Sequence, residues 1–86
     1  MMRIETKSGY KAYHCTATEI KITGGKGICD SCGKPHRLGY LIPVLNRWYC
    51  EGCFNEWDNS TRFYGSDNAV EQRVDAYYRQ MIPLTG

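Results

Sequence analysis

Four cysteines stand in two short pairs, and their type and spacing are the clearest chemical signal in the chain. Cys29 and Cys32 form the first pair and Cys50 and Cys53 the second, with two residues inside each pair and seventeen between the pairs. A C-x-x-C turn aims both sulfurs at one point, and a seventeen-residue spacer is long enough for a hairpin that returns the chain to that point. The pattern predicts one structural Zn²⁺ ion bound by these four cysteines.

A zinc ion with four thiolate ligands has no open coordination position for water or substrate. The pattern therefore argues against metal-assisted hydrolysis, and no paired carboxylates or nucleophile–base motif indicates another catalytic site. We expect no enzyme activity, no catalytic residue and no organic cofactor. The alternatives for the cysteines are two disulfides, which need an oxidising compartment, a redox-active C-x-x-C, or iron in place of zinc.

The chain length favours a metal-stabilised fold. With 86 residues, the sequence predicts one domain over residues 1–86 that buries too little apolar surface for a large margin of stability. Zinc binding contributes on the order of 10 kcal/mol in such modules. The first residues lack the apolar core of a signal peptide, and no stretch reaches the length of a membrane span. We therefore expect a soluble, cytoplasmic protein in a reducing compartment.

Charge is unevenly distributed along the chain. Residues 1–49 contain eight Lys and Arg against three Asp and Glu, whereas residues 50–86 contain three against six. Four thiolates and one Zn²⁺ sum to −2, and nearby cations can offset that charge. We expect Lys26, Lys34 and Arg47 to do so, in preference to forming a nucleic-acid patch, because the sequence has no dense basic run.

Residues 1–28, ahead of the first cysteine pair, are predicted to be a β segment. Ile4–Thr6 and Tyr10–Cys15 flank a predicted hairpin turn at Lys7–Gly9, and Glu19–Thr23 alternates polar and apolar residues as a strand does. Gly24–Gly27 then predicts a flexible turn.

Residues 29–60 are predicted to form the zinc finger itself. Gly33 favours a tight loop after the first pair, because glycine adopts positive φ without strain. Leu38–Leu45 and Arg47–Tyr49 predict two strands joined at Asn46, and Pro43 favours an edge position. From the second pair onward, the apolar and cysteine residues recur at the spacing of a helix, so the second pair should lie at the start of a helix. These residues are Cys50, Cys53, Phe54 and Trp57.

A last helix is predicted over residues 66–82, between a polar N-cap region and Pro83. Five larger side chains lie along one side of this helix, and we expect them to pack on the zinc module as core rather than to face a partner. They are Val70, Val74, Tyr77, Tyr78 and Met81.

The residues around the two pairs resemble a known family. Cys29-Asp-Ser-Cys32-Gly-Lys-Pro, followed by Arg47-Trp-Tyr-Cys50-Glu-Gly-Cys53, resembles the four-cysteine zinc finger of the DksA/TraR family, and with Phe54 also one zinc half of a LIM domain. The resemblance covers residues 29–54 and implies a treble-clef zinc finger. DksA/TraR proteins act on RNA polymerase through an acidic-tipped helical segment before the finger. The residues before Cys29 are predicted to be strands without such a tip, so the resemblance implies only the ligand roles here.

Three further residues have metal-binding or nucleophilic side chains. Cys15 is predicted to be a small buried apolar residue. His14 is adjacent to it and should point to the opposite face of the strand, so the two cannot readily share a metal. His36 lies four residues beyond Cys32 and is an alternative ligand if the first loop is irregular.

Binding of another macromolecule is the function that these features favour. Aromatic residues surround the second pair, and rings around a zinc hairpin form core or contact protein partners. We therefore expect a small adaptor or regulatory module that binds a protein. The alternative is a nucleic-acid-binding or transcription-associated zinc finger that uses the basic first half. No membrane and no small-molecule substrate is expected.

Overall fold

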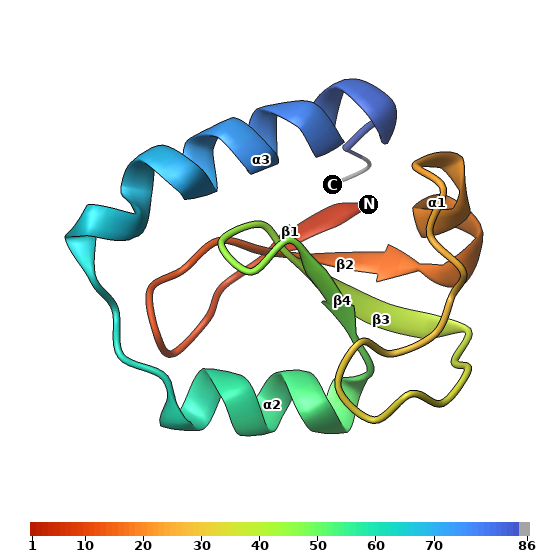
Figure 1. The fold of residues 1–86 in the computed structure, drawn as a ribbon, viewed down its shortest axis with the longest axis horizontal. Coiled ribbons are helices and arrows are strands. Elements are labelled where there is room, and N and C mark those ends of the chain that lie inside the picture. The colour runs from red at the N-terminus through yellow and green to blue at the C-terminus, as the bar shows by residue number, and fades with distance from the viewer. Residues whose placement is uncertain (85–86) are drawn as a thin grey trace.

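The computed structural model describes residues 1–84, which form a four-stranded antiparallel sheet with helices on both faces (Figure 1). The elements are β1 (Met2–Ile4), β2 (Ala12–Thr16), α1 (Ala17–Ile22), β3 (Leu38–Ile42), β4 (Arg47–Tyr49), α2 (Glu51–Ser60) and α3 (Asn68–Met81), with a 3-10 turn at Gly65–Asp67. The strand order is β1-β2-β3-β4, so every strand pairs with its neighbour along the chain. The prediction of a small α+β fold with a C-terminal helix is confirmed.

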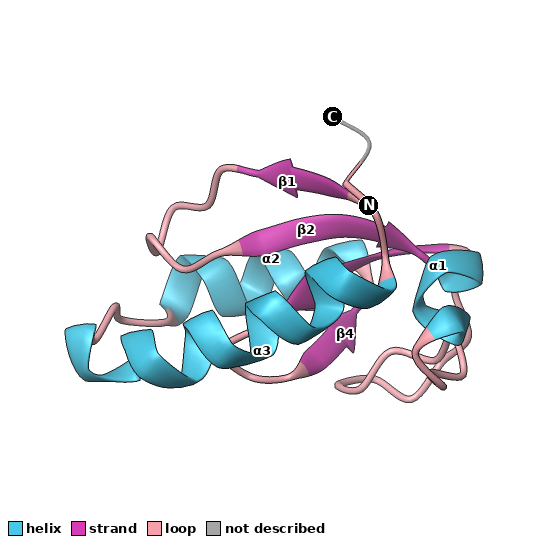
Figure 2. Ribbon diagram, turned by 90° about the horizontal axis from the view of Figure 1, so that it is seen from above, coloured by secondary structure: helices cyan, strands magenta, loops and turns pink. Residues whose placement is uncertain are grey.

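The sheet buries apolar side chains on both faces, and each face has its own helix. Tyr13 pairs with Leu41 across β2 and β3, and both belong to the core that includes Ile82 after α3. Ala12 and Ile42 point the other way and pack with Phe54 of α2. Alternate residues of a strand face opposite sides, which explains the division. Figure 2 shows α3 lying along β2, while α2 covers the opposite face.

The segment Glu19–Thr23 was predicted to be a strand, and this prediction is wrong. Residues 17–22 form helix α1. The backbone N–H of Glu19 donates to Thr16 Oγ1 at 3.1 Å, and the N–H of Thr16 donates to Glu19 Oε1 at 3.0 Å. This reciprocal capping box fixes a helix start. Five residues of polar–apolar alternation are compatible with a short helix as well as with a strand, and the capping box favours the helix.

The connection between β1 and β2 is longer than the predicted hairpin turn. β1 ends at Ile4, so residues 5–11 form a loop that crosses to helix α2. There the Asp58 carboxylate accepts the N–H groups of Lys7 and Ser8 at 2.9 and 3.0 Å. Burial raises the pKa of Asp58, but these donors outweigh it and hold the pKa below its usual value. A buried carboxylate of α2 therefore shapes the first loop.

The hairpin before the second cysteine pair has the predicted turn residue but a shorter first strand. Asn46 adopts φ of 53° between β3 and β4, a conformation that Asn tolerates well. β3 is an inner strand, paired with both β2 and β4, and not an edge strand. It ends at Ile42, so Pro43 lies in the turn and removes no hydrogen bond from the sheet.

Helix α3 occupies the predicted region, but the predicted core stripe is wrong for most of its members. Val70, Tyr77 and Met81 are 41%, 50% and 40% exposed. Val74 and Tyr78 are half-buried, and only Tyr78 packs against the sheet core. A different face of the helix therefore contacts the sheet.

Carboxylates form that contacting face. They lie at intervals of four residues on α3 and its N-cap, so they share one side of the helix. Each accepts a hydrogen bond from the segment that enters β2: Asp67 from Tyr10 Oη at 2.6 Å, Glu71 from the N–H of Lys11 at 2.9 Å, and Asp75 from Tyr13 Oη. We call these three residues the carboxylate row. They dock the helix by hydrogen bonds, so the apolar side chains need not face inward.

Gly39 of β3 is required by its contact with Trp48 of β4. A Cβ at this position would lie 2.4 Å from two indole carbons of Trp48 and 2.8 Å from the Tyr49 carbonyl oxygen. The indole cannot yield easily, because it is buried and its Nε1 donates to the Cys15 carbonyl at 2.8 Å. We expect Gly39→Ala to lower the free energy of unfolding by about 3 kcal/mol, as overpacking does.

Urea unfolding of the metal-loaded protein measures this effect, with Gly52→Ala as the control. Gly52 lies in α2 and has nothing within 4 Å of its would-be Cβ. Its replacement should therefore be neutral or stabilising by about 0.5–1 kcal/mol. Equal effects of the two substitutions would contradict the role of the Gly39–Trp48 contact.

Candidate metal centre

The structure brings the two cysteine pairs together at one end of α2. The sulfur atoms of Cys29, Cys32, Cys50 and Cys53 all lie within 4.8 Å of one another. Cys29 and Cys50 are buried, Cys53 is half-buried and Cys32 is exposed. All five cysteines of the chain are free thiols, so neither pair forms a disulfide. The cluster is therefore able to hold one metal ion.

The first pair lies in a tight loop that turns backbone N–H groups toward sulfur. The N–H of Gly33 donates to the Cys29 carbonyl at 2.9 Å. Gly33 adopts φ of 74°, which confirms the positive φ predicted for a glycine at this position. The N–H groups of Ser31 and Cys32 point at Cys29 Sγ, at 3.4 and 3.5 Å. Such donors favour the thiolate form of Cys29, which is the form that binds a metal.

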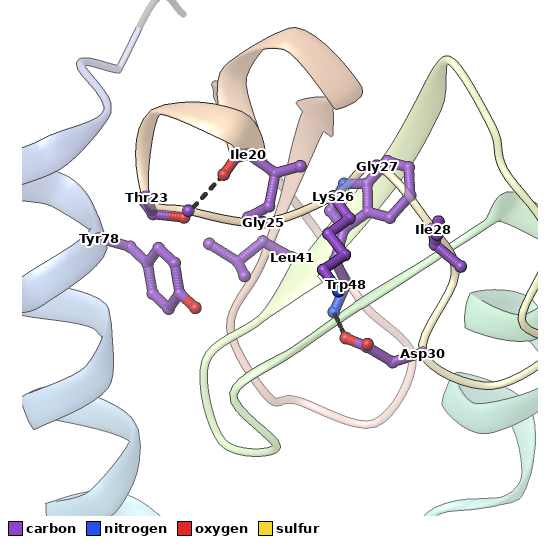
Figure 3. A pocket seen from close by; sticks show the side chains of 11 residues that line it. Ile20, Thr23, Gly25, Lys26, Gly27, Ile28, Asp30, Leu41, Trp48 and Tyr78 are labelled. Atoms are coloured by element: carbon purple, nitrogen blue, oxygen red, sulfur yellow. Dashed lines mark hydrogen bonds between the residues drawn. The ribbon is translucent and has the colours of Figure 1, made fainter.

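Asp30 holds this loop against strand β4. Its carboxylate accepts the N–H of Trp48 at 2.8 Å (Figure 3). Its own N–H donates to the Trp48 carbonyl at 2.9 Å. These two bonds fix the first cysteine pair relative to the strand that leads directly into the second. The sequence gives no sign of this role, because a polar residue inside a C-x-x-C is ordinary.

The second pair lies at the start of α2, as predicted. Cys50 is the N-cap residue, and its carbonyl accepts the N–H of Phe54 at 2.9 Å. Cys53 is in the first turn. Unpaired N–H groups at a helix N-terminus create positive potential, which stabilises thiolates placed there. Phe54 is buried against Ile42 and Ala12, so the helix that presents both sulfurs is anchored on the sheet.

The pKa values of the Cys29 and Cys53 thiols are shifted in opposite directions. Burial raises the pKa of Cys29, but the N–H donors of Cys32, Cys50 and Ser31 outweigh it and lower that pKa to about 6. A Ser31 hydrogen bond favours the Cys53 thiolate, yet the neighbouring sulfurs prevail and raise the pKa of Cys53 to about 12. Like charges this close cannot all ionise without a cation between them. The thiol cluster is therefore chemically matched to a metal.

The other predicted residues stay outside the cluster of four sulfurs. His36 Nε2 lies 3.8 Å from Cys32 Sγ, on the rim of the site. Cys15 is fully buried in the sheet core, which raises the pKa of its thiol to about 12. His14 lies on the opposite face, with its ring 5.4 Å from the ring of Tyr40. Cys15 is therefore a buried apolar residue, as predicted.

Replacing Asp30 should weaken metal binding although Asp30 is not a ligand. Asp30→Ala removes the acceptor of the Trp48 N–H, and loss of such supporting partners reduces metal affinity about 10- to 100-fold. Asp30→Asn keeps an acceptor oxygen, so its metal affinity should fall much less. Zinc competition with a chromophoric chelator measures both affinities. Wild-type affinity in Asp30→Ala would contradict the proposed role of this contact.

The chain matches no protein-family model, no curated protein and no solved structure. Among residues 1–84, none of the helices is both long and apolar enough to cross a membrane. The resemblance to the DksA/TraR and LIM fingers therefore rests on residues 29–54 alone. What the fold and the site together give is a small α+β protein whose four clustered cysteines can hold a metal ion.

Proposed function

We propose that this chain is a treble-clef zinc module, without enzyme activity, that binds a protein partner. Four thiolates in a tetrahedral set are typical of structural zinc, and such a set leaves no position for a substrate. A loop supplies the first two ligands and the start of a helix supplies the last two, with a hairpin between them, which is the treble-clef arrangement. Free thiols in the cluster favour a reducing compartment for this protein.

Zinc in this proposal has a structural role. The chain between α1 and β3 contains no helix or strand and only one isolated bridge, Ile28 with Pro35. Within this segment, the two Asp30 bonds hold the loop of the first pair against β4, and the metal adds a link from that loop to the start of α2. Zinc therefore links the loop of the first pair to α2 and fixes the surface that the loop forms.

The apolar side of α3 is the single observation that favours a protein partner. Val70, Val74, Tyr77 and Met81 follow one another at spacings of four, three and four residues, which is the repeat of a helix–helix seam. We call them the α3 stripe. Three of the four are 40% to 50% exposed, because the carboxylate row and not the stripe docks the helix. The occupant proposed is an amphipathic helix of another protein, with apolar residues at the same spacing.

Site-specific cross-linking tests this proposal. A photoreactive phenylalanine replaces Tyr77 in the stripe. As the matched control, it replaces Gln72, an exposed residue of the same helix outside the stripe. In cell extract at high salt, we expect position 77 and not position 72 to cross-link a protein, since apolar contacts resist salt. Tyr77→Ser with Met81→Ser should abolish capture of that same protein by the otherwise unmodified chain.

Three results would overturn the proposal. These are equal cross-linking from both positions, no cross-linked protein, and capture that persists in the double variant. Zinc analysis of each purified variant shows whether the metal site has been retained. One zinc per chain is expected, and a folded chain without zinc would contradict the structural role of the metal.

A further inference from the structure

A basic cleft lies between α1 and the segment that joins the first cysteine pair to β3. Its volume is about 270 Å³. Lys21 comes from α1, Lys26 from the glycine-rich turn, and Arg37 from the residues before β3. His36 also lines it. No Asp or Glu is among the residues that line the cleft.

Among residues 1–84, the cations of this cleft have no acidic partner within ion-pair distance. The ion pairs among residues 1–84 join the Met1 amine to Glu19, and Lys11 and Arg79 to Asp75. Glu19, the acid nearest in sequence to Lys21, is also occupied by the cap of α1. Asp30 lines the adjoining cavity, and its carboxylate accepts the N–H of Trp48. Lys26, which we expected to offset the charge of the zinc–thiolate cluster, lines this cleft together with Lys21 and Arg37. None of the three forms an ion pair with an acidic side chain of residues 1–84.

Backbone contacts hold the three segments of the cleft together. The N–H of His36 donates to the Gly27 carbonyl at 3.1 Å, and the N–H of Ala17 donates to the Arg37 carbonyl at 2.8 Å. Gly27 adopts φ of 72°, and a Cβ there would lie 3.0 Å from Ala17 Cβ. The same Cβ would be 3.6 Å from Lys21 Cε, so the Lys21 side chain lies beside this turn. The cations are thus placed by fixed backbone and not by a mobile tail.

We propose that this cleft binds the phosphate groups of a nucleic-acid backbone. Phosphate recognition needs cations and little else, and it carries no sequence preference. An acidic peptide is a poorer fit, because peptide sites combine charge with apolar anchor pockets, and here only Ala17 and Pro35 are apolar side chains. The cleft is separate from the α3 stripe, so this activity goes beyond the proposed protein partner.

Fluorescence anisotropy with zinc-loaded protein tests the proposal. The probes are a short labelled DNA duplex, a single-stranded RNA and a polyglutamate peptide. Three phosphate contacts predict that duplex affinity falls about 40-fold between roughly 50 and 200 mM salt. Lys21→Gln with Lys26→Gln and Arg37→Gln should bind at least about 10-fold more weakly at the lower salt and lose most of the salt dependence.

The control carries the same change in net charge away from the cleft: Lys7→Gln with Arg62→Gln and Arg73→Gln. It should keep the wild-type salt dependence, and Lys21→Arg with Lys26→Arg should keep the affinity because charge is what the site supplies. An equal loss in cleft and control variants would overturn the proposal, as would no binding by the wild type. Tighter binding of polyglutamate than of either nucleic acid would overturn it in favour of an acidic protein ligand. None of these results depends on the α3 stripe, so the two proposals fail separately.

Discussion

Removal of the metal is expected to unfold this protein and not merely to loosen one loop. The cysteine cluster joins the loop of the first pair to the start of α2, and between them lies the β3–β4 hairpin. β3 is an inner strand, so its release also exposes β2. Zinc in small modules contributes on the order of 10 kcal/mol, which equals the whole stability of a small domain. Far-ultraviolet circular dichroism during chelator titration should show a cooperative loss of structure.

Two cysteine variants separate the metal from the thiol. Cys29→Ser removes a buried ligand that accepts two backbone N–H groups, so we expect zinc content to fall and the fold to be lost. Cys15→Ser alters an equally buried sulfur outside the cluster, and should retain one zinc per chain while losing about 1–3 kcal/mol from an imperfectly satisfied hydroxyl. A protein that keeps native amide chemical-shift dispersion in its NMR spectrum after a chelator has removed the metal would contradict the structural role of the metal.

The cysteine cluster was predictable because its information is local. Two C-x-x-C turns and a hairpin spacer leave few ways to arrange four sulfurs, and the structure places them within 4.8 Å. Gly33 and Asn46 were predictable for the same reason, since each occupies a turn that needs positive φ. Helix α1 was predictable but missed: the Thr16–Glu19 capping box is visible in the sequence and outweighs five residues of alternation.

The orientation of α3 could not be predicted from the helix alone. Its apolar spacing predicts which residues share a side, but the choice of side to bury depends on partners elsewhere. Those partners are Tyr10, Lys11 and Tyr13, between 57 and 62 residues away in the chain. Donors that satisfy three carboxylates make the polar side the better contact. The hydrogen bonds between Asp30 and Trp48 were missed for the same reason, because partners 18 residues apart in the chain leave no local signature.

Asp75 is expected to be the most important single side chain outside the metal site. It is 3% exposed, accepts the Tyr13 hydroxyl, and has Lys11 Nζ at 3.6 Å and Arg79 Nη1 at 3.8 Å. Asp75→Ala removes the acceptor and leaves the Tyr13 hydroxyl buried without a partner. Breaking a buried charge network in this way costs about 3–5 kcal/mol. Urea unfolding measures the loss in the free energy of unfolding. Asp75→Asn keeps an acceptor oxygen, so its free energy of unfolding should fall less than that of Asp75→Ala.

Tyr13→Phe completes a double-mutant cycle with Asp75→Ala. In the wild-type background, Tyr13→Phe deprives a buried carboxylate of its donor and should lower the free energy of unfolding by about 1.5–3 kcal/mol. In the Asp75→Ala background, the same substitution should lower that free energy far less. Additive effects would show that the two residues act independently and would contradict the docking role of this bond.

Alkaline pH tests the same bond from the tyrosine side. Burial, then the hydrogen bond to Asp75 and the charge of that carboxylate, raise the pKa of Tyr13 from 10.0 to about 12. A group whose pKa is higher in the folded state contributes its full stability below the unfolded value and loses it as pH rises through the folded value. The Tyr13 contribution should therefore be intact below pH 10 and disappear toward about pH 12. Because other tyrosines titrate in this range, the informative quantity is the difference between wild type and Tyr13→Phe. That difference must shrink as pH rises, and a constant difference would mean that Tyr13 holds α3 by packing alone.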